Sequence, residues 1–155
     1  MEENTTGADP IVSKIAEYAR KTNHNKGLVM GIIQKAKNDR TIAEASIEAL
    51  SLRADLVAET YDINAYLADL NSKLAKQKRT RLDQKINPTQ GGHSQVRYQN
   101  GPDRNVAIAA EMADLTKITE TIGGYQSFLK GMIETLDKLG YSIKSRIDLE
   151  NLGFT

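Results

Sequence analysis

Residues 41–85 read TIAEASIEALSLRADLVAETYDINAYLADLNSKLAKQKRTRLDQK, and this stretch determines the fold class. It opens on Thr41-Ile-Ala-Glu44, a spacing typical of a helix capping box. Apolar residues then recur mostly in steps of three and four, as on a helix that packs in a coiled-coil-like seam. They are Ile42, Ala45, Ala49, Leu52, Leu56, Ile63, Leu67, Leu70 and Leu74. Glu59 and the Thr after it interrupt this seam, but Gly and Pro are absent between Asn38 and Asn87, so we predict one helix of about 45 residues.

A polar segment rich in turn-forming residues follows. It contains three groups of turn-forming residues, Asn87-Pro88, Gly91-Gly92 and Asn100-Gly101-Pro102-Asp103. We therefore predict a connecting loop over residues 87–104. Loops longer than about 12–15 residues are usually functional or disordered.

A second long apolar stripe follows in a helix predicted to start near Asp103, again in steps of three and four. The stripe is too long and too apolar to be covered by one partner helix, so we expect a homo-oligomer larger than a dimer. The residues predicted to form this oligomerisation surface are Leu115, Ile118, Ile122, Tyr125, Leu129, Met132, Leu136, Leu139, Ile143 and Ile147. Gly140 is expected to be a left-handed C-cap, followed by a short helix over residues 142–149.

The first forty residues predict two short helices. Asp9-Pro10 is a typical helix start, and the polar residues 21–25 predict a break before a second helix over residues 26–37. The fold class is therefore predicted as all-α: a long helical hairpin with a polar connecting loop and short flanking helices, oligomerising through the C-terminal helices. Residues 1–40 are expected to be an N-terminal extension and residues 41–155 the hairpin.

Composition excludes several classes of function. The chain has no Cys, which excludes disulfide scaffolds, thiol catalysis and Cys-ligated zinc. His24 and His93 lie in turn-like stretches without an acid or hydroxyl at the spacing of a catalytic triad or a metal site. We therefore predict that the protein is not an enzyme and uses no cofactor and no metal. The absence of a signal-peptide pattern and of an apolar run of about 18 residues predicts a cytoplasmic protein without membrane contact.

The charge distribution is strongly uneven although the net charge is only +1. Residues 41–72 hold six acids and one base, whereas residues 73–85 hold six bases and one acid. The basic run leads into a polar loop that carries further cations and an aromatic residue, a combination that tracks phosphates and stacks bases of single-stranded nucleic acid. The predicted DNA-binding residues are Lys76, Lys78, Arg79, Arg81, Lys85, Arg97 and Tyr98. A solvated helix end, whose cations only complement the helix dipole, is the alternative interpretation.

Two short motifs resemble the phage recombination mediator family called UvsY. They are Arg79-Thr80-Arg81-Leu82-Asp83 after the long helix and Gly140-Tyr141-Ser142-Ile143-Lys144-Ser145-Arg146-Ile147 near the C-terminus. The resemblance covers roughly residues 42–152. In that family the basic segment is followed by aromatic residues, whereas Gln84-Lys85 stands here.

The resemblance implies a protein that loads a RecA-like recombinase onto single-stranded DNA covered by single-strand-binding protein, in the host cytoplasm. It implies that Arg79 and Arg81 contact DNA and that the C-terminal helices form a ring. The competing hypothesis is a non-enzymatic structural helical protein, such as a phage virion component or an assembly scaffold. In that case the basic segment is a solvated surface or contacts an acidic partner. Salt-dependent binding of single strands discriminates between the two.

Overall fold

The computed structural model describes residues 10–86 and 101–153, and all secondary structure in these ranges is α-helical. The helices are α1 (Pro10–Ala36), α2 (Ile42–Ile86), α3 (Gly101–Glu111) and α4 (Ala113–Asn151). The predicted all-α class is therefore confirmed for the described part of the chain. Residues 1–9 and 87–100, including Arg97 and Tyr98, lie outside it.

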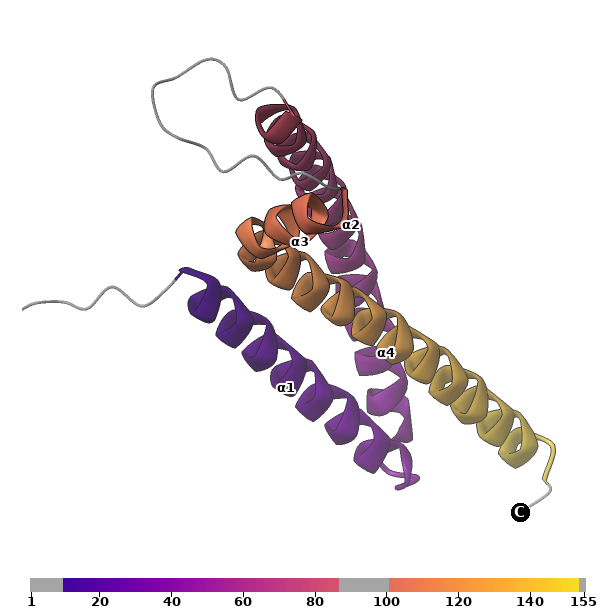
Figure 1. Cartoon of the computed structure of the whole chain (residues 1–155). Coiled ribbons are helices and arrows are strands. Elements are labelled where there is room, and N and C mark those ends of the chain that lie inside the picture. Colours follow the sequence, from indigo (N-terminus) through magenta and orange to yellow (C-terminus); the bar gives the residue numbers. More distant parts are fainter. Residues whose placement is uncertain (1–9, 87–100, 154–155) are drawn as a thin grey trace, which may run out of the picture.

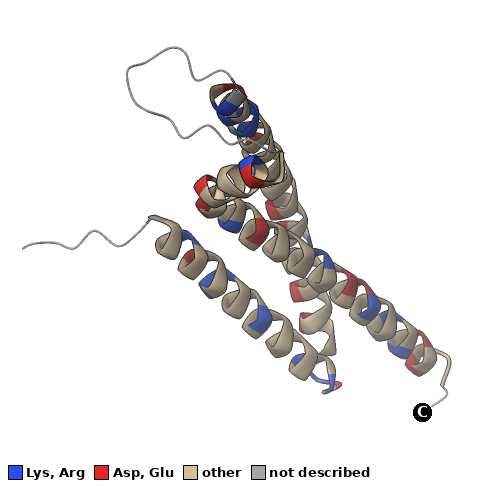
Figure 2. Cartoon of the chain, viewed as in Figure 1, with Lys and Arg blue, Asp and Glu red and all other residues tan. Residues whose placement is uncertain are grey.

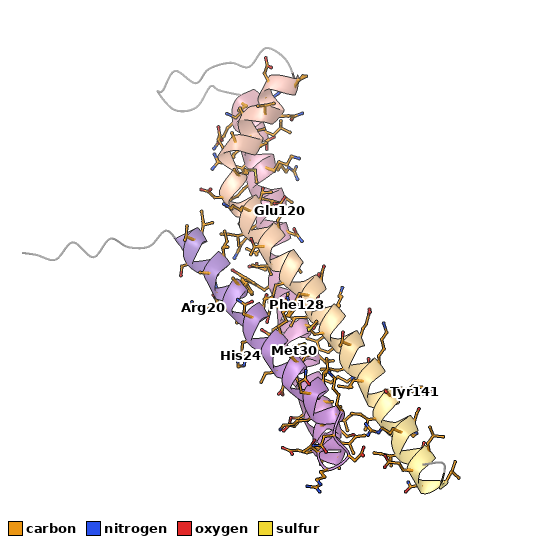
Figure 3. All side chains as sticks on the ribbon, turned by 90° about the horizontal axis from the view of Figure 1, so that it is seen from below. Arg20, His24, Met30, Glu120, Phe128 and Tyr141 are labelled. Atoms are coloured by element: carbon orange, nitrogen blue, oxygen red, sulfur yellow. The ribbon has the colours of Figure 1, made fainter. Side chains whose placement is uncertain are left out.

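Helices α1, α2 and α4 pack side by side along much of their length (Figure 1). Three side-chain pairs show that α2 and the α3–α4 segment run in opposite directions: Arg53 with Asp137, Asn64 with Gln126, and Lys85 with Glu111. Helix α1 contacts both α2 and α4, and Figure 3 shows it lying alongside α4. The core therefore lies between three helices of alternating direction.

The start of α2 was predicted correctly, but its capping differs from the prediction. The Thr41 hydroxyl donates to the backbone oxygen of Lys35 at 2.7 Å, an oxygen near the end of α1 that also accepts from the backbone N–H of Asn38 at 3.2 Å. Glu44 reaches the side chain of Lys35 at 2.8 Å instead of completing a capping box. Thr41 thus joins the end of α1 to the start of α2.

The predicted break in α1 at residues 21–25 is wrong, because these residues continue one helix. Asn25 is buried, and its Nδ2 donates to the hydroxyl of Tyr125 in α4 at 3.1 Å. It lies on the same helix face as Tyr18, Val29 and Ile32, which are all in the core. Packing of this face against α2 and α4 outweighs the weak helix propensity of Asn, Thr and His.

The C-terminal half differs from its prediction in two places. Residues 101–104 form the first turn of α3 rather than the end of a loop, and the helix is interrupted at Met112, where the axis changes direction (Figure 1). Gly140 lies inside α4 and is not a C-cap. Leu136 and Ile143, both buried, continue the apolar stripe across it, and the left-handed glycine after the helix is Gly153 with a φ of 72°.

The apolar stripe of α4 is covered within a single chain. Ile122, Tyr125, Leu129, Leu136 and Ile143 are buried, and the other five predicted oligomerisation residues pack against the same core cluster. Those five are Leu115, Ile118, Met132, Leu139 and Ile147. Helix α1, expected to be an extension, supplies the second partner that this stripe requires. These ten residues therefore belong to the core of one chain or pack against it, and the oligomer through α4 stays a prediction.

A polar junction explains why Glu59 interrupts the seam of α2. The Tyr125 hydroxyl donates to Glu59 Oε1 at 3.0 Å and accepts from Asn25, while Lys21 Nζ lies 3.4 Å from the same Glu59 oxygen. Burial raises the pKa of Tyr125, and the hydrogen bond and negative charge of Glu59 raise it further. The junction joins α1, α2 and α4 at one point of the core.

Candidate nucleic-acid interface

The basic run occupies the last turns of α2, where Figure 2 shows Lys and Arg gathered at one end of the helix. Lys76, Lys78 and Arg79 are exposed there. None of the three forms an ion pair with another residue of the described part of the chain. Three exposed cations without an ion-pair partner among the described residues thus stand within four consecutive residues.

Arg81 and Lys85, predicted to contact DNA, form ion pairs that hold α2 against α3. Arg81 Nη1 lies 2.6 Å from Glu111 Oε2, and Lys85 Nζ lies 2.8 Å from Glu111 Oε1. The hydrogen bonds from Lys85 and then Arg81 hold the pKa of Glu111 below its ordinary value. Glu111 was not foreseen as part of the site, because nothing in the sequence places the end of α3 beside α2. It offsets part of the positive charge at this end of the molecule.

The three exposed cations do not all point the same way. At about 100° per residue, Lys76 and Arg79 share a helix face because they are three positions apart. Lys78 points toward α3 and lines a shallow groove of about 420 Å³ with Leu74, Ile108 and Met112. A strand bound to Lys76 and Arg79 would therefore lie on the outer face of α2, with Lys78 at its edge.

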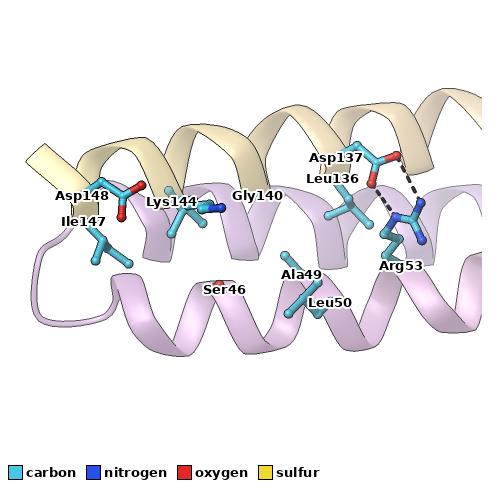
Figure 4. A pocket seen from close by; sticks show the side chains of 11 residues that line it. Ser46, Ala49, Leu50, Arg53, Leu136, Asp137, Gly140, Lys144, Ile147 and Asp148 are labelled. Carbon is cyan, nitrogen blue, oxygen red and sulfur yellow. Dashed lines mark hydrogen bonds and ion pairs between the residues drawn. The ribbon is translucent and has the colours of Figure 1, made fainter.

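A larger groove lies at the opposite end of the bundle, between the start of α2 and the end of α4 (Figure 4). It measures about 510 Å³, and its apolar lining includes Ala49, Leu50 and Ile147. Arg53 and Asp137 form an ion pair on its wall, with Arg53 Nη2 3.4 Å from Asp137 Oδ2. No group of three metal-ligating side chains occurs among the described residues, and no described helix is long and apolar enough to cross a membrane.

Comparison with known proteins gives no relative: no protein-family model, no curated protein and no solved structure matches this chain. The resemblance to recombination mediators therefore rests on its two short motifs. The first lies at the basic end of α2, and the second lies within α4.

Proposed function

We propose that this protein binds single-stranded DNA through the basic end of α2 and acts as a recombination mediator. The observation that supports binding is the cluster of Lys76, Lys78 and Arg79, which are exposed and lack counter-ions among the described residues. The mediator role, in which a RecA-like recombinase replaces single-strand-binding protein on DNA, comes from the resemblance of residues 79–83 and 140–147. The proposal includes no catalytic step.

The expected strength of binding follows from charge. Each neutralised phosphate contributes about −0.7 to the slope of log affinity against log salt for single strands. Three contacts therefore predict a slope of about −2 for one chain. A site of this size binds weakly alone, so tight binding requires several chains on one strand, which raises the effective concentration of each site.

The test is a salt titration of binding to a labelled oligonucleotide, followed by fluorescence anisotropy. The double variant Lys76→Ala with Arg79→Ala should weaken binding to all sequences alike and flatten the slope to about −0.7, because one contact remains. Both positions are exposed and Ala favours helix, so helicity should not change. The matched control is Lys130→Ala with Lys138→Ala, which removes two exposed cations of α4 and should leave binding as in the wild type.

Two results would reject the binding proposal. One is wild-type protein that shows no salt-sensitive binding at low ionic strength, as the structural hypothesis predicts. The other is a control variant that loses as much affinity as the α2 variant, since binding would then reflect general charge. If binding is present, the mediator role is tested by adding the protein to a recombinase reaction on coated single strands. An unchanged rate of recombinase loading would reject that role alone.

A further inference from the structure

Helix α2 carries a second apolar stripe, on the side opposite to its core seam. Its residues are Ala43, Ile47, Leu50, Ala54, Val57, Tyr61, Ala65 and Ala68, again spaced by three and four. None of them belongs to the core. Ile47, Leu50 and Tyr61 are 70%, 65% and 70% exposed, and among the others only Val57 is half-buried. A helix that is apolar on two faces normally has partners on both.

We propose that this outer face of α2 binds the outer face of α2 in a second copy of the chain, with the two helices antiparallel. The interface is distinct from the α4 stripe, which the chain covers by itself, and it does not depend on DNA binding. A stripe with steps of three and four is suited to a helix with the same spacing, because side chains of each helix then fit between those of the other.

Side-chain sizes favour the antiparallel orientation. If the two-fold axis passes between Val57 and Ala58, each large residue faces a small one across the interface. The facing pairs are Ile47 with Ala68, Leu50 with Ala65, and Tyr61 with Ala54. In a parallel pair every residue would face its own copy, so Tyr61 would meet Tyr61 while Ala54, Ala65 and Ala68 would leave gaps. Gaps and overpacking both lower stability.

Charged residues on the flank of α2 add little to this choice of orientation. Antiparallel copies bring Lys73 of one chain within a turn of Glu44 of the other, but Lys73 already pairs with Asp69 at 2.6 Å and Glu44 with Lys35 at 2.8 Å. Near the centre the same flank brings Asp55 close to Asp62 of the other copy, and neither is ion-paired in the described part of the chain. Both are exposed and lie well outside the apolar seam, where water and salt screen their repulsion.

The length over which the two antiparallel helices overlap limits the expected affinity. Residues 43–72 span about 44 Å of helix, and a strip about 10 Å wide gives roughly 900 Å² in projection for the two copies together. This is close to the roughly 1,000 Å² expected of a specific interface. We therefore expect a dimer that forms at micromolar concentrations and dissociates on dilution.

The first test is sedimentation equilibrium from micromolar to near-millimolar protein. The wild type should approach twice the 17.1 kDa of one chain. In a dimer of the Leu50→Glu variant, each copy places one carboxylate in the apolar interface. The variant should therefore raise the dissociation constant at least roughly tenfold. Its fold should be unchanged, because the side chain is already exposed. Tyr141→Glu is the matched control, an equally exposed apolar residue on α4, and should dimerise like the wild type.

The second test determines orientation by cross-linking. The chain has no Cys, so Ala54→Cys and Tyr61→Cys each introduce a single thiol. In the antiparallel register these two positions face each other, whereas two copies of residue 54 lie about 10 Å apart, beyond the reach of a disulfide. Oxidising a mixture of the two variants, one carrying a mass tag, should give mixed dimers. A wild type that stays monomeric throughout, a Leu50→Glu variant that dimerises normally, or Ala54→Cys homodimers would overturn the proposal.

Discussion

The hydroxyl of Tyr125 is predicted to determine much of the stability of the three-helix core. Tyr125→Phe removes one oxygen atom and leaves the ring, which packs against Tyr18 with 5.1 Å between centroids. The variant therefore opens no cavity next to the ring. What changes is the hydrogen bonding of Asn25 and Glu59, which lie on the two other helices.

The expected loss of unfolding free energy depends on whether Asn25 and Glu59 keep other hydrogen-bond or ion-pair partners in the variant. The side chain of Asn25 is buried, and loss of the 3.1 Å bond leaves its Nδ2 without an acceptor. An unsatisfied buried polar group costs about 1–3 kcal/mol. Glu59 loses less, because its side chain is 27% exposed and Lys21 stays within 3.4 Å. We expect a loss of about 2 kcal/mol of unfolding free energy, which lowers the melting temperature by about 4–8 °C for a domain of this size.

The assay is urea unfolding followed by far-ultraviolet circular dichroism. Tyr61→Phe is the matched control, because Tyr61 is 70% exposed and its variant should stay within about 0.5 kcal/mol of the wild type. The double variant Asn25→Leu with Tyr125→Phe should be more stable than Tyr125→Phe alone. In the double variant an apolar side chain replaces the buried amide, which would otherwise lack a hydrogen-bond partner. If Tyr125→Phe and Tyr61→Phe are equally stable, the junction does not stabilise the core.

The pKa of Tyr125 provides a second readout. Burial and Glu59 raise the pKa of Tyr125 in the folded protein. At about pH 10 an unfolded tyrosine therefore ionises, whereas the phenol of Tyr125 stays protonated in the native state. The unfolded state then binds fewer protons than the native state, so the contribution of Tyr125 is constant below about pH 10 and lost as pH rises further. Tyr125→Phe should show a smaller loss of stability above about pH 10 than the wild type.

Three further predictions follow from packing and charge. Leu129→Ala, at a residue with 0% exposure, should cost about 2–5 kcal/mol in thermal unfolding; a smaller effect would indicate that α4 is not covered within the chain. Gly140→Ala should stabilise by up to about 1 kcal/mol, because a Cβ at this helical position meets no atom within 4 Å; destabilisation would support the left-handed cap instead. Glu111→Gln should strengthen single-strand binding because it removes the ion pair of Arg81 with Glu111, and unchanged affinity would show that Arg81 does not reach the DNA.

Long, regular stretches could be predicted from the sequence because their local signals agree. For α2, the spacing of apolar residues and the lack of Gly and Pro both indicate a helix, and its bounds differ from the prediction by about one residue. The interruption at Met112 has no such signal, since no Gly or Pro lies within three residues of it. At the basic end, the sequence identifies the exposed cations but not Glu111, which lies beside α2 only because α3 packs against that helix.

The error in the prediction of α1 has one physical origin, the side chain of Asn25. On a sequence basis Asn within the polar residues 21–25 indicates a turn, so α1 was divided and could not serve as a long packing partner. Without a long α1, the sequence offers the stripe of α4 too little cover inside one chain, which is why it also predicts an oligomer. The bond from Asn25 to Tyr125 lets a polar residue lie in the core, so α1 continues through residues 21–25 as one helix. Among the described residues no helix covers the outer stripe of α2 as α1 covers the stripe of α4, which is why we propose the outer stripe as the dimer interface.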